Sequence, residues 1–253
     1  MGVISKTLYT LGFFIRTLTG SFTFIFKGRR VSYRILIMQI LFTFVEALGI
    51  SALLAMGIGA TVCAIGLPFL ASFSQEMFVF PLLITILVRE LGPLLAGLII
   101  SARSATAIAT EIAGMVISHE VEAYISVGVD PVEYLGVPRF LAVTISMLLL
   151  SIYFSFIGII ASFLATQLSF PLPPGVFFSN LMGSLTLADI CITLIKSIVI
   201  GMIISTIAIL AGFSVEHSTT EIPVAGLQAV GKSFFWIVVV DLILSAFYYL
   251  ALV

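Results

Sequence analysis

Residues 78–115 read FVFPLLITILVRELGPLLAGLIISARSATAIATEIAGM, an apolar tract that contains four charged side chains. The tract is long enough to cross a membrane as a helix, which needs about 20 predominantly apolar residues. Its charged residues are Arg89, Glu90, Arg103 and Glu111. Because each charge in hydrocarbon costs at least ~2.5 kcal/mol, these side chains are expected to pair, to face a wet cavity or to lie near an interface.

The composition of the whole chain also predicts a membrane protein. Of the 253 residues, 61% are hydrophobic and 9% are charged, so too few polar side chains exist to cover a water-soluble fold. The net charge of −1 gives no bulk attraction to nucleic acid. Cys63 and Cys191 lie in apolar stretches and are expected to be buried and inert, and the histidines are isolated at His119 and His217. We therefore expect no metal site and no catalytic residues.

Four more apolar tracts accompany the first one, at residues 35–71, 137–168, 190–213 and 234–253. Together they predict an all-α integral membrane protein with five transmembrane helices. As one helix, the tract 35–71 would reach about 55 Å, well beyond the ~30 Å hydrocarbon core. This helix must therefore start in the cytoplasm, tilt steeply or break.

The distribution of Lys and Arg predicts the orientation. Residues 1–34 contain six basic residues and no acidic one, whereas the loops 72–77 and 169–188 contain no Lys or Arg. The positive-inside rule then places the N-terminus, Arg139 and Lys232 on the cytoplasmic side and the C-terminus on the outer side. Apolar residues recur at helical spacing within 1–34, which predicts an amphipathic helix in the headgroup plane.

A polar, acidic segment separates the second and third tracts. Residues 116–137 read VISHEVEAYISVGVDPVEYLGV. The pattern predicts a short cytoplasmic helix parallel to the membrane, ended by Gly128 and the turn at Asp130-Pro131. A motor subunit could bind to a helix of this kind. The alternative interpretation is a solvated connector.

Five motifs, in this order along the chain, resemble the MlaE/YrbE family of permeases. They are Arg89-Glu90-Leu91-Gly92-Pro93; Ser101-Ala102-Arg103-Ser104 with Thr110-Glu111-Ile112 and Gly114; Glu122-Ala123 with Gly128-Val129-Asp130-Pro131 and Val137-Pro138-Arg139; Leu194-Ile195-Lys196-Ser197; and Asp241. The resemblance covers about residues 35–250. It implies a single MlaE-type permease domain over 1–253, with an interfacial segment 1–34, a transmembrane region 35–253 and a coupling loop 116–137.

The resemblance implies the permease subunit of an MCE-type lipid ABC transporter, which moves phospholipid or a related lipid between the inner membrane and the periplasm or outer membrane. The implied partners are a second permease copy, a cytoplasmic ABC ATPase dimer that binds ATP and magnesium, and a periplasmic MCE-domain protein. The permease itself would bind no cofactor, and the expected location is a bacterial inner membrane. The resemblance also implies a lipid cavity at Arg89, Glu90 and Leu91, and ATPase contacts at Glu120, Glu122, Ala123, Gly128, Asp130 and Pro131.

The intramembrane charges need partners. Adjacent residues point about 100° apart on a helix, so Arg89 and Glu90 are not expected to pair face to face. Lys196 and Asp241 lie at comparable depth, which makes Glu90–Lys196 and Arg89–Asp241 candidate pairs, although the swapped pairing stays open. The expected network comprises Arg89, Glu90, Arg103, Glu111, Lys196 and Asp241, and it suits a structural role or a transport role equally.

Two other classes of protein are alternatives. An intramembrane enzyme is poorly supported, because neither histidine lies within a span and the cysteines lack a basic partner. An ion-coupled secondary transporter also uses intramembrane charges, but it would not need the polar helix within 116–137. Residues 226–233, GLQAVGKS, fit the nucleotide-binding P-loop pattern. That pattern requires a preceding strand and a soluble domain, whereas a membrane span follows here, so we interpret the match as coincidence.

Overall fold

The computed structural model describes residues 12–21, 23–24, 30–169, 172–216 and 218–252. Within these ranges every regular element is helical, and no strand is present. The α-helices are α2 (Arg30–Ala71), α3 (Val79–Leu83), α4 (Leu91–Ile100), α5 (Thr106–Ile117), α6 (Glu120–Ser126), α7 (Val137–Ser169), α8 (Pro174–Ser184), α9 (Leu187–Phe213) and α10 (Glu221–Leu252). A 3₁₀ turn, η1 (Glu76–Phe78), precedes α3, and π-helical segments η2 (Ile84–Glu90), η3 (Ser101–Ala105) and η4 (Val132–Gly136) interrupt the long helices.

Five stretches of the described chain are long and apolar enough to cross a membrane, which confirms the predicted fold class. They are Tyr33–Ala71, Glu76–Ile117, Val132–Ser169, Leu187–Phe213 and Glu221–Leu250. The predicted start of the last span at residue 234 was wrong, because α10 begins at Glu221. The GLQAVGKS stretch therefore lies inside a continuous helix, whose backbone N–H groups are used in the helix and cannot cradle a phosphate.

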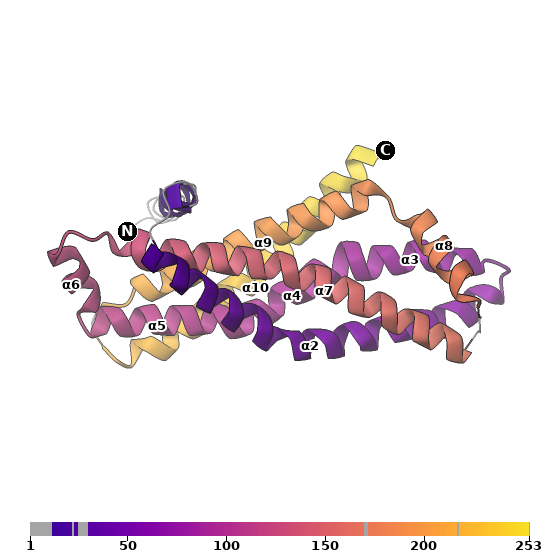
Figure 1. The fold of residues 1–253 in the computed structure, drawn as a ribbon, viewed down its shortest axis with the longest axis horizontal. Helices are drawn as coiled ribbons and strands as arrows, with labels where there is room; N and C mark the ends of the chain where they lie inside the picture. The colour runs from indigo at the N-terminus through magenta and orange to yellow at the C-terminus, as the bar shows by residue number, and fades with distance from the viewer. Residues whose placement is uncertain (1–11, 22, 25–29, 170–171, 217, 253) are drawn as a thin grey trace.

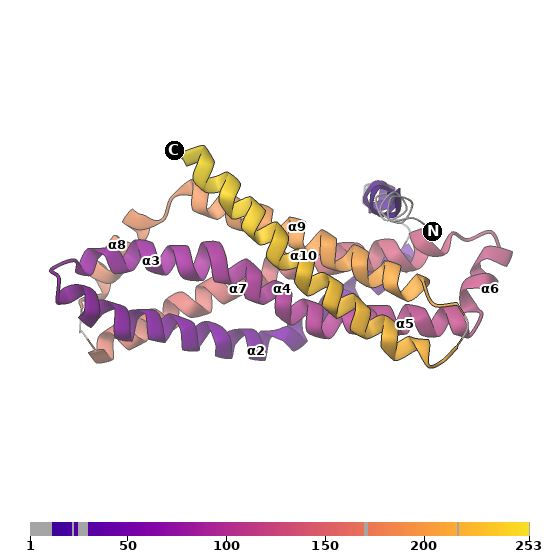
Figure 2. The same cartoon turned by 180° about the vertical axis from the view of Figure 1, so that it is seen from behind.

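The spans run alternately up and down an elongated bundle. Figure 1 shows α6 and the α9–α10 connection at one end, and the α2–α3 turn and α8 at the other; the C-terminus lies in the α8 half. We call these ends the α6 end and the α8 end. From behind, α10 crosses the bundle diagonally (Figure 2).

Helix α2 is a single helix of 42 residues, so a break, one of the three alternatives for this tract, does not occur. It packs most extensively against α7. At their closest approach a Cβ on Gly59 would collide with the carbonyl oxygen of Gly158, and the hydroxyl of Ser162 donates a 2.9 Å hydrogen bond to the Gly59 carbonyl. Small residues thus let two membrane helices touch through their backbones.

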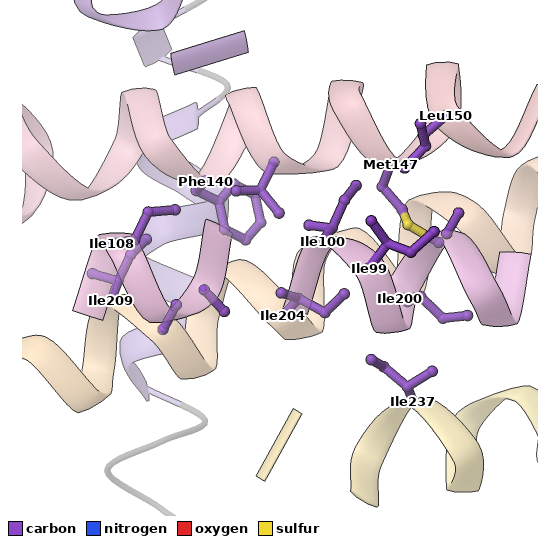
Figure 3. Packing of buried hydrophobic residues seen from close by; sticks show 14 of the residues in the cluster. Ile99, Ile100, Ile108, Phe140, Met147, Leu150, Ile200, Ile204, Ile209 and Ile237 are labelled. Carbon is purple, nitrogen blue, oxygen red and sulfur yellow. The ribbon is translucent and has the colours of Figure 1, made fainter. Parts of the chain in front are cut away.

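The main core lies between α4, α5, α7, α9 and α10. Figure 3 shows its side chains meeting from these helices, with Ile99 and Ile100 of α4 close to Met147 of α7 and Ile200 of α9. The outer spans α2 and α10 bury only 22% and 17% of their most apolar windows. Their large exposed apolar side chains suit contact with lipid or with another protein.

Residues 12–21 form a helix that belongs to the predicted amphipathic segment; residues 1–11, 22 and 25–29 of that segment lie outside the described chain. Phe13 and Thr17 are buried, and the Phe13 ring lies 6.4 Å from the ring of Phe213 at the end of α9. Ile15, one of the apolar residues that recur at helical spacing in this segment, is exposed. Leu18, from the same set of apolar residues, packs against the core, so part of this set contacts the bundle.

The two cysteines differ in environment. Cys63 is buried, as expected, but the expected burial of Cys191 is wrong, because this residue is exposed near the start of α9. An apolar surface residue in a membrane span faces outward without cost, since lipid is itself apolar.

Candidate functional site

Lys196 of α9 is the centre of a buried polar cluster. Its side chain is 0% exposed. The ammonium nitrogen Nζ lies 2.7 Å from Oε2 of Glu90 in η2, 3.0 Å from Oδ1 of Asp241 and 2.7 Å from Oγ of Ser245, both in α10. The Ser245 hydroxyl also donates to Glu90 Oε2 at 2.7 Å. One buried cation thus links three spans, and it pairs with two carboxylates.

A proline explains how the backbone takes part in this cluster. Pro93 has no N–H, so the carbonyl of Arg89, four residues earlier, loses its α-helical donor. The helix widens here into η2, where the N–H of Leu91 donates to the carbonyl of Ile86. The Arg89 carbonyl instead accepts a 3.1 Å hydrogen bond from Lys196 Nζ. The π-helical segment thereby turns a main-chain oxygen toward the buried ammonium.

Arg89 is held by side chains from the ends of α9 and α10. Its guanidinium donates to Asp189 Oδ1 at 3.1 Å, to Thr85 Oγ1 at 3.1 Å and to the hydroxyl of Tyr249 at 2.5 Å. The guanidinium carbon lies 4.8 Å from the ring centroids of both Tyr248 and Tyr249. Only 11% of the Arg89 side chain is exposed, so two aromatic rings cover most of this cation.

Asp189 is positioned by the start of its own helix. Thr186 caps α9: its hydroxyl accepts from the Asp189 N–H at 3.2 Å and donates to Asp189 Oδ2 at 2.6 Å. The other oxygen, Oδ1, accepts from the Tyr248 hydroxyl at 2.8 Å and from Arg89. This reciprocal cap fixes the carboxylate and points one oxygen at the guanidinium.

The structure settles the pairing that the sequence left open. The candidate pair Glu90–Lys196 is present. The candidate pair Arg89–Asp241 was wrong: Arg89 pairs with Asp189, and Asp241 pairs with Lys196. The expectation that Arg89 and Glu90 stay apart was also wrong, since Nε and Oε1 lie 3.5 Å apart. Glu90 ends the π-helical segment with φ −105° and ψ −66°, which departs from the helix geometry behind that expectation.

Sequence reasoning missed Asp189, Ser245, Tyr248 and Tyr249. Two local signals point to them. Thr186-Leu187-Ala188-Asp189 has the spacing of a helix cap, which would have placed the aspartate in the first turn of α9. Paired tyrosines near the end of a span are typical of the membrane interface.

Arg103 and Glu111 lie outside this cluster, although the sequence placed them in the same network. Arg103 donates to Oε2 of Glu46 in α2 at 2.7 Å, and Arg139 of α7 lies 2.8 Å from Glu111. The reason is distance along the helix, because Arg103 follows Glu90 by 13 positions, which correspond to about 20 Å. The expected network is therefore three separate groups of ion pairs.

The predicted short helix at the α6 end is present. Helix α6 contains Glu120, Glu122 and Ala123 and lies across the end of the bundle (Figure 1). Gly128 ends it in the left-handed region, at φ +75°, where Val129 N–H donates to the Tyr124 carbonyl at 2.9 Å. No residue of α6 itself is buried.

Asp130 and Pro131 start the return to the bundle. The Asp130 carboxylate accepts from the N–H of Val132 at 2.9 Å and pairs with Arg16 of the N-terminal helix. Between this helix and the 121–132 segment lies a pocket of about 910 Å³, which Phe213 also lines. The polar α6 end is thus tied to the N-terminal helix by one ion pair beside an open groove.

Comparisons with known proteins extend over most of the chain. The family described as Permease MlaE matches residues 36–247. A probable ABC transporter permease protein of Rickettsia typhi is 31% identical over 175 residues, which cover 69% of this chain and 68% of the relative. The intermembrane phospholipid transport system permease protein MlaE of Haemophilus influenzae is 29% identical, with 86% and 84% covered. The chloroplastic protein trigalactosyldiacylglycerol 1 of Arabidopsis thaliana is 27% identical, with 64% and 46% covered.

Proposed function

This chain belongs to the MlaE permease family, and from that membership we propose that it is the membrane subunit of an ABC transporter that moves phospholipid or a related lipid. The match to an intermembrane phospholipid transport permease over 86% of the chain supports this substrate class. The structural observation that carries the proposal is the separation of two polar features: the exposed helix α6 at one end, and the buried Lys196 cluster toward the other.

ATP hydrolysis belongs to a separate subunit in this proposal. A cytoplasmic ATPase dimer binds α6 and the following turn. The contact residues are Glu120, Glu122, Ala123, Gly128, Asp130 and Pro131. Movement of α6 then passes to α5 and, through η4, to α7, and the spans rock as rigid bodies. This mechanism accounts for a polar helix that packs little against its own chain.

The transported lipid meets the permease near the α8 end. Arg89, Glu90 and Leu91 line the lipid cavity, and Lys196 and Asp241 hold its wall together. Leu91 is partly buried at the start of α4, directly after the charged pair. A guanidinium beside an apolar side chain suits a molecule with a phosphate and acyl chains.

A second copy of this chain completes the cavity. Glu46 and Arg103 form an ion pair whose side chains are 44% and 41% exposed in the middle of the spans. Such a pair is costly against hydrocarbon, so this face fits a second protomer or a water-filled space between two protomers. In the bacterial inner membrane the α6 end and N-terminus face the cytoplasm, and a periplasmic MCE-domain protein meets the α8 end.

A pull-down tests this assignment. The tagged chain is purified in mild detergent from its native membrane, as wild type and as Gly128→Arg. We expect the wild type to retain an ATPase and phospholipid, and Gly128→Arg to lose the ATPase, because arginine adds bulk and strain at φ +75°.

Two controls separate local from global effects. Gly128→Asn tolerates a positive φ and should retain the ATPase. Gly183→Arg introduces the same charge in α8, where a Cβ meets open space, and should also retain it. A wild-type chain that purifies intact without any ATPase would contradict the ABC assignment and favour an ion-coupled transporter.

A further inference from the structure

The N-terminal helix is fixed to the bundle at the α6 end. Phe13, Thr17 and Ser21 recur every four residues and are at most 8% exposed, so one stripe of this helix faces the bundle. The ring of Phe14 also lies 6.4 Å from the ring of Phe140 in α7. Figures 1 and 2 show the helix nearly end-on, so it runs across the long axis of the bundle. It is a fixed element beside α6.

Helix α6 is held much less firmly. No residue of α6 is buried, and its main contacts within the described chain are with α5, the helix before it. Beyond its other end, the chain passes through Gly128, at φ +75°, to Asp130 and Pro131. One end of α6 is therefore anchored through α5, whereas the position of the other end depends on what holds this turn.

An ion pair joins the turn to the N-terminal helix. Arg16 donates to Oδ2 of Asp130, and Oδ1 of the same carboxylate accepts from the N–H of Val132 at 2.9 Å. Across the described ranges, no other hydrogen bond or ion pair connects α6 or its turn to this helix. Val121 and Ile125 of α6 instead line the open groove of about 910 Å³ that separates the two.

The pair is weak in the folded state as a whole and important for α6. The side chains of Arg16 and Asp130 are 58% and 29% exposed, and an ion pair in contact with water contributes little to folding stability. Little else restrains the turn, so the same small free energy decides how often α6 occupies one position. A docking element that is already in place loses less freedom on binding, which raises its affinity for a partner.

We propose that Arg16 is a positioning residue for ATPase docking: through Asp130 it holds the turn after α6 against the N-terminal helix, in the position that the ATPase binds. The inference rests on the proposed function. Arg16 acts without touching the ATPase, because it raises the fraction of chains in which α6 is ready to bind. The N-terminal helix thereby becomes part of the docking platform.

A titration tests the effect on affinity. The ATPase recovered in the pull-down is purified and titrated onto the full chain in detergent, as wild type and as Arg16→Gln. We expect Arg16→Gln to raise the Kd about threefold, a shift that matches the strength of an exposed ion pair. In about 1 M NaCl, where the Debye length is about 3 Å, the two chains should bind alike. A structural defect would persist in high salt.

Two matched variants separate the ion pair from general effects of charge. Arg16→Lys keeps a cation that can reach the carboxylate, and it should restore the wild-type Kd. Lys232→Gln removes a cation from α10 that hydrogen-bonds to Gln228 of its own helix at 3.3 Å, and it should also keep the wild-type Kd. Thermal unfolding of Arg16→Gln should match that of the wild type, because the pair contributes little to folding.

Spin labels test the position of α6 without the ATPase. The labels are attached at Thr19→Cys and Ser126→Cys, both exposed, in a background without other cysteines. We expect a narrow distance distribution in the wild type and a broader one in Arg16→Gln. Asp130→Asn should broaden it equally, although its amide oxygen can still accept from the N–H of Val132. This variant also tests the inference if Arg16→Gln does not fold.

The outcomes distinguish the two levels of the proposal. If the wild type binds the ATPase and Arg16→Gln binds it with the same Kd, or if the labels keep a narrow distribution, the positioning role is wrong while the proposed function stands. Equal weakening in Lys232→Gln attributes the effect to general charge and overturns the inference. A wild-type chain that binds no ATPase contradicts the proposed function itself, and the inference with it.

Discussion

At the scale of single residues, the contacts of Lys196 join three spans in the interior of the bundle. Its ammonium satisfies two carboxylates, a hydroxyl and a carbonyl that come from two other spans. Removing one partner of a buried ion pair destabilises a protein far more than replacing the whole pair by apolar residues. The reason is that the remaining charges stay buried without compensation.

We expect Lys196→Met to destabilise the protein by about 3–5 kcal/mol, since it leaves Glu90 and Asp241 without their cation. The change is measured as the loss of unfolding free energy in detergent. Adding Asp241→Asn to Lys196→Met should recover part of that loss, because one uncompensated charge disappears. Equal stability of the single and double variants would show that Asp241 does not depend on Lys196.

At the scale of elements, the contact between α2 and α7 depends on glycine at one position and not at a neighbouring one. A Cβ at Gly59 would run into the Gly158 backbone, whereas a Cβ at Gly57 meets nothing within 4 Å. Both glycines lie in the same helix, two residues apart, so they form a matched pair for testing helix packing.

Gly59→Ala should destabilise the protein by about 1–3 kcal/mol, because the added methyl forces two backbones apart. Gly57→Ala should instead stabilise it by about 0.5–1 kcal/mol through higher helix propensity. Thermal unfolding of the two variants in the same detergent gives the comparison. A loss of stability in both would mean that the α2–α7 contact is not the cause.

The elements also show which parts of the molecule the sequence could predict. Apolar length located all five spans, and the Gly128 and Asp130-Pro131 signals located α6, because both rest on local patterns. Helix α8 was missed: it follows a proline-rich turn and has only 11 residues, so its apolar face is short, with Phe177 and Leu181 as its buried residues. The partner of Arg89 was missed because Asp189 is 100 residues away in sequence, and only tertiary packing joins them.

At the scale of the whole molecule, the alternation of the spans places the loops into two sets at opposite ends (Figure 1). Gln75 is exposed in the α2–α3 turn, and Ser126 is exposed at the end of α6. Labelling at these two positions therefore shows on which side of the membrane each end of the bundle lies.

We expect Gln75→Cys to react with a membrane-impermeant maleimide in intact spheroplasts, and Ser126→Cys to react only after permeabilisation. The physical reason is the proposed orientation, in which the positive-inside rule assigns the α6 end to the cytoplasm. The background carries Cys63→Ala and Cys191→Ala, because Cys191 is exposed. Labelling of Ser126→Cys in intact spheroplasts would reverse the proposed orientation.

The participation of α10 in the Lys196 cluster has a consequence for biogenesis. During synthesis Arg89 and Glu90 leave the ribosome first, Lys196 follows, and Asp241 and Ser245 come last. The charges of the second span thus enter the insertion machinery before most of their partners exist. The ion cluster can therefore close only when α10 arrives, because Asp241 and Ser245, which contact Lys196, belong to this final helix.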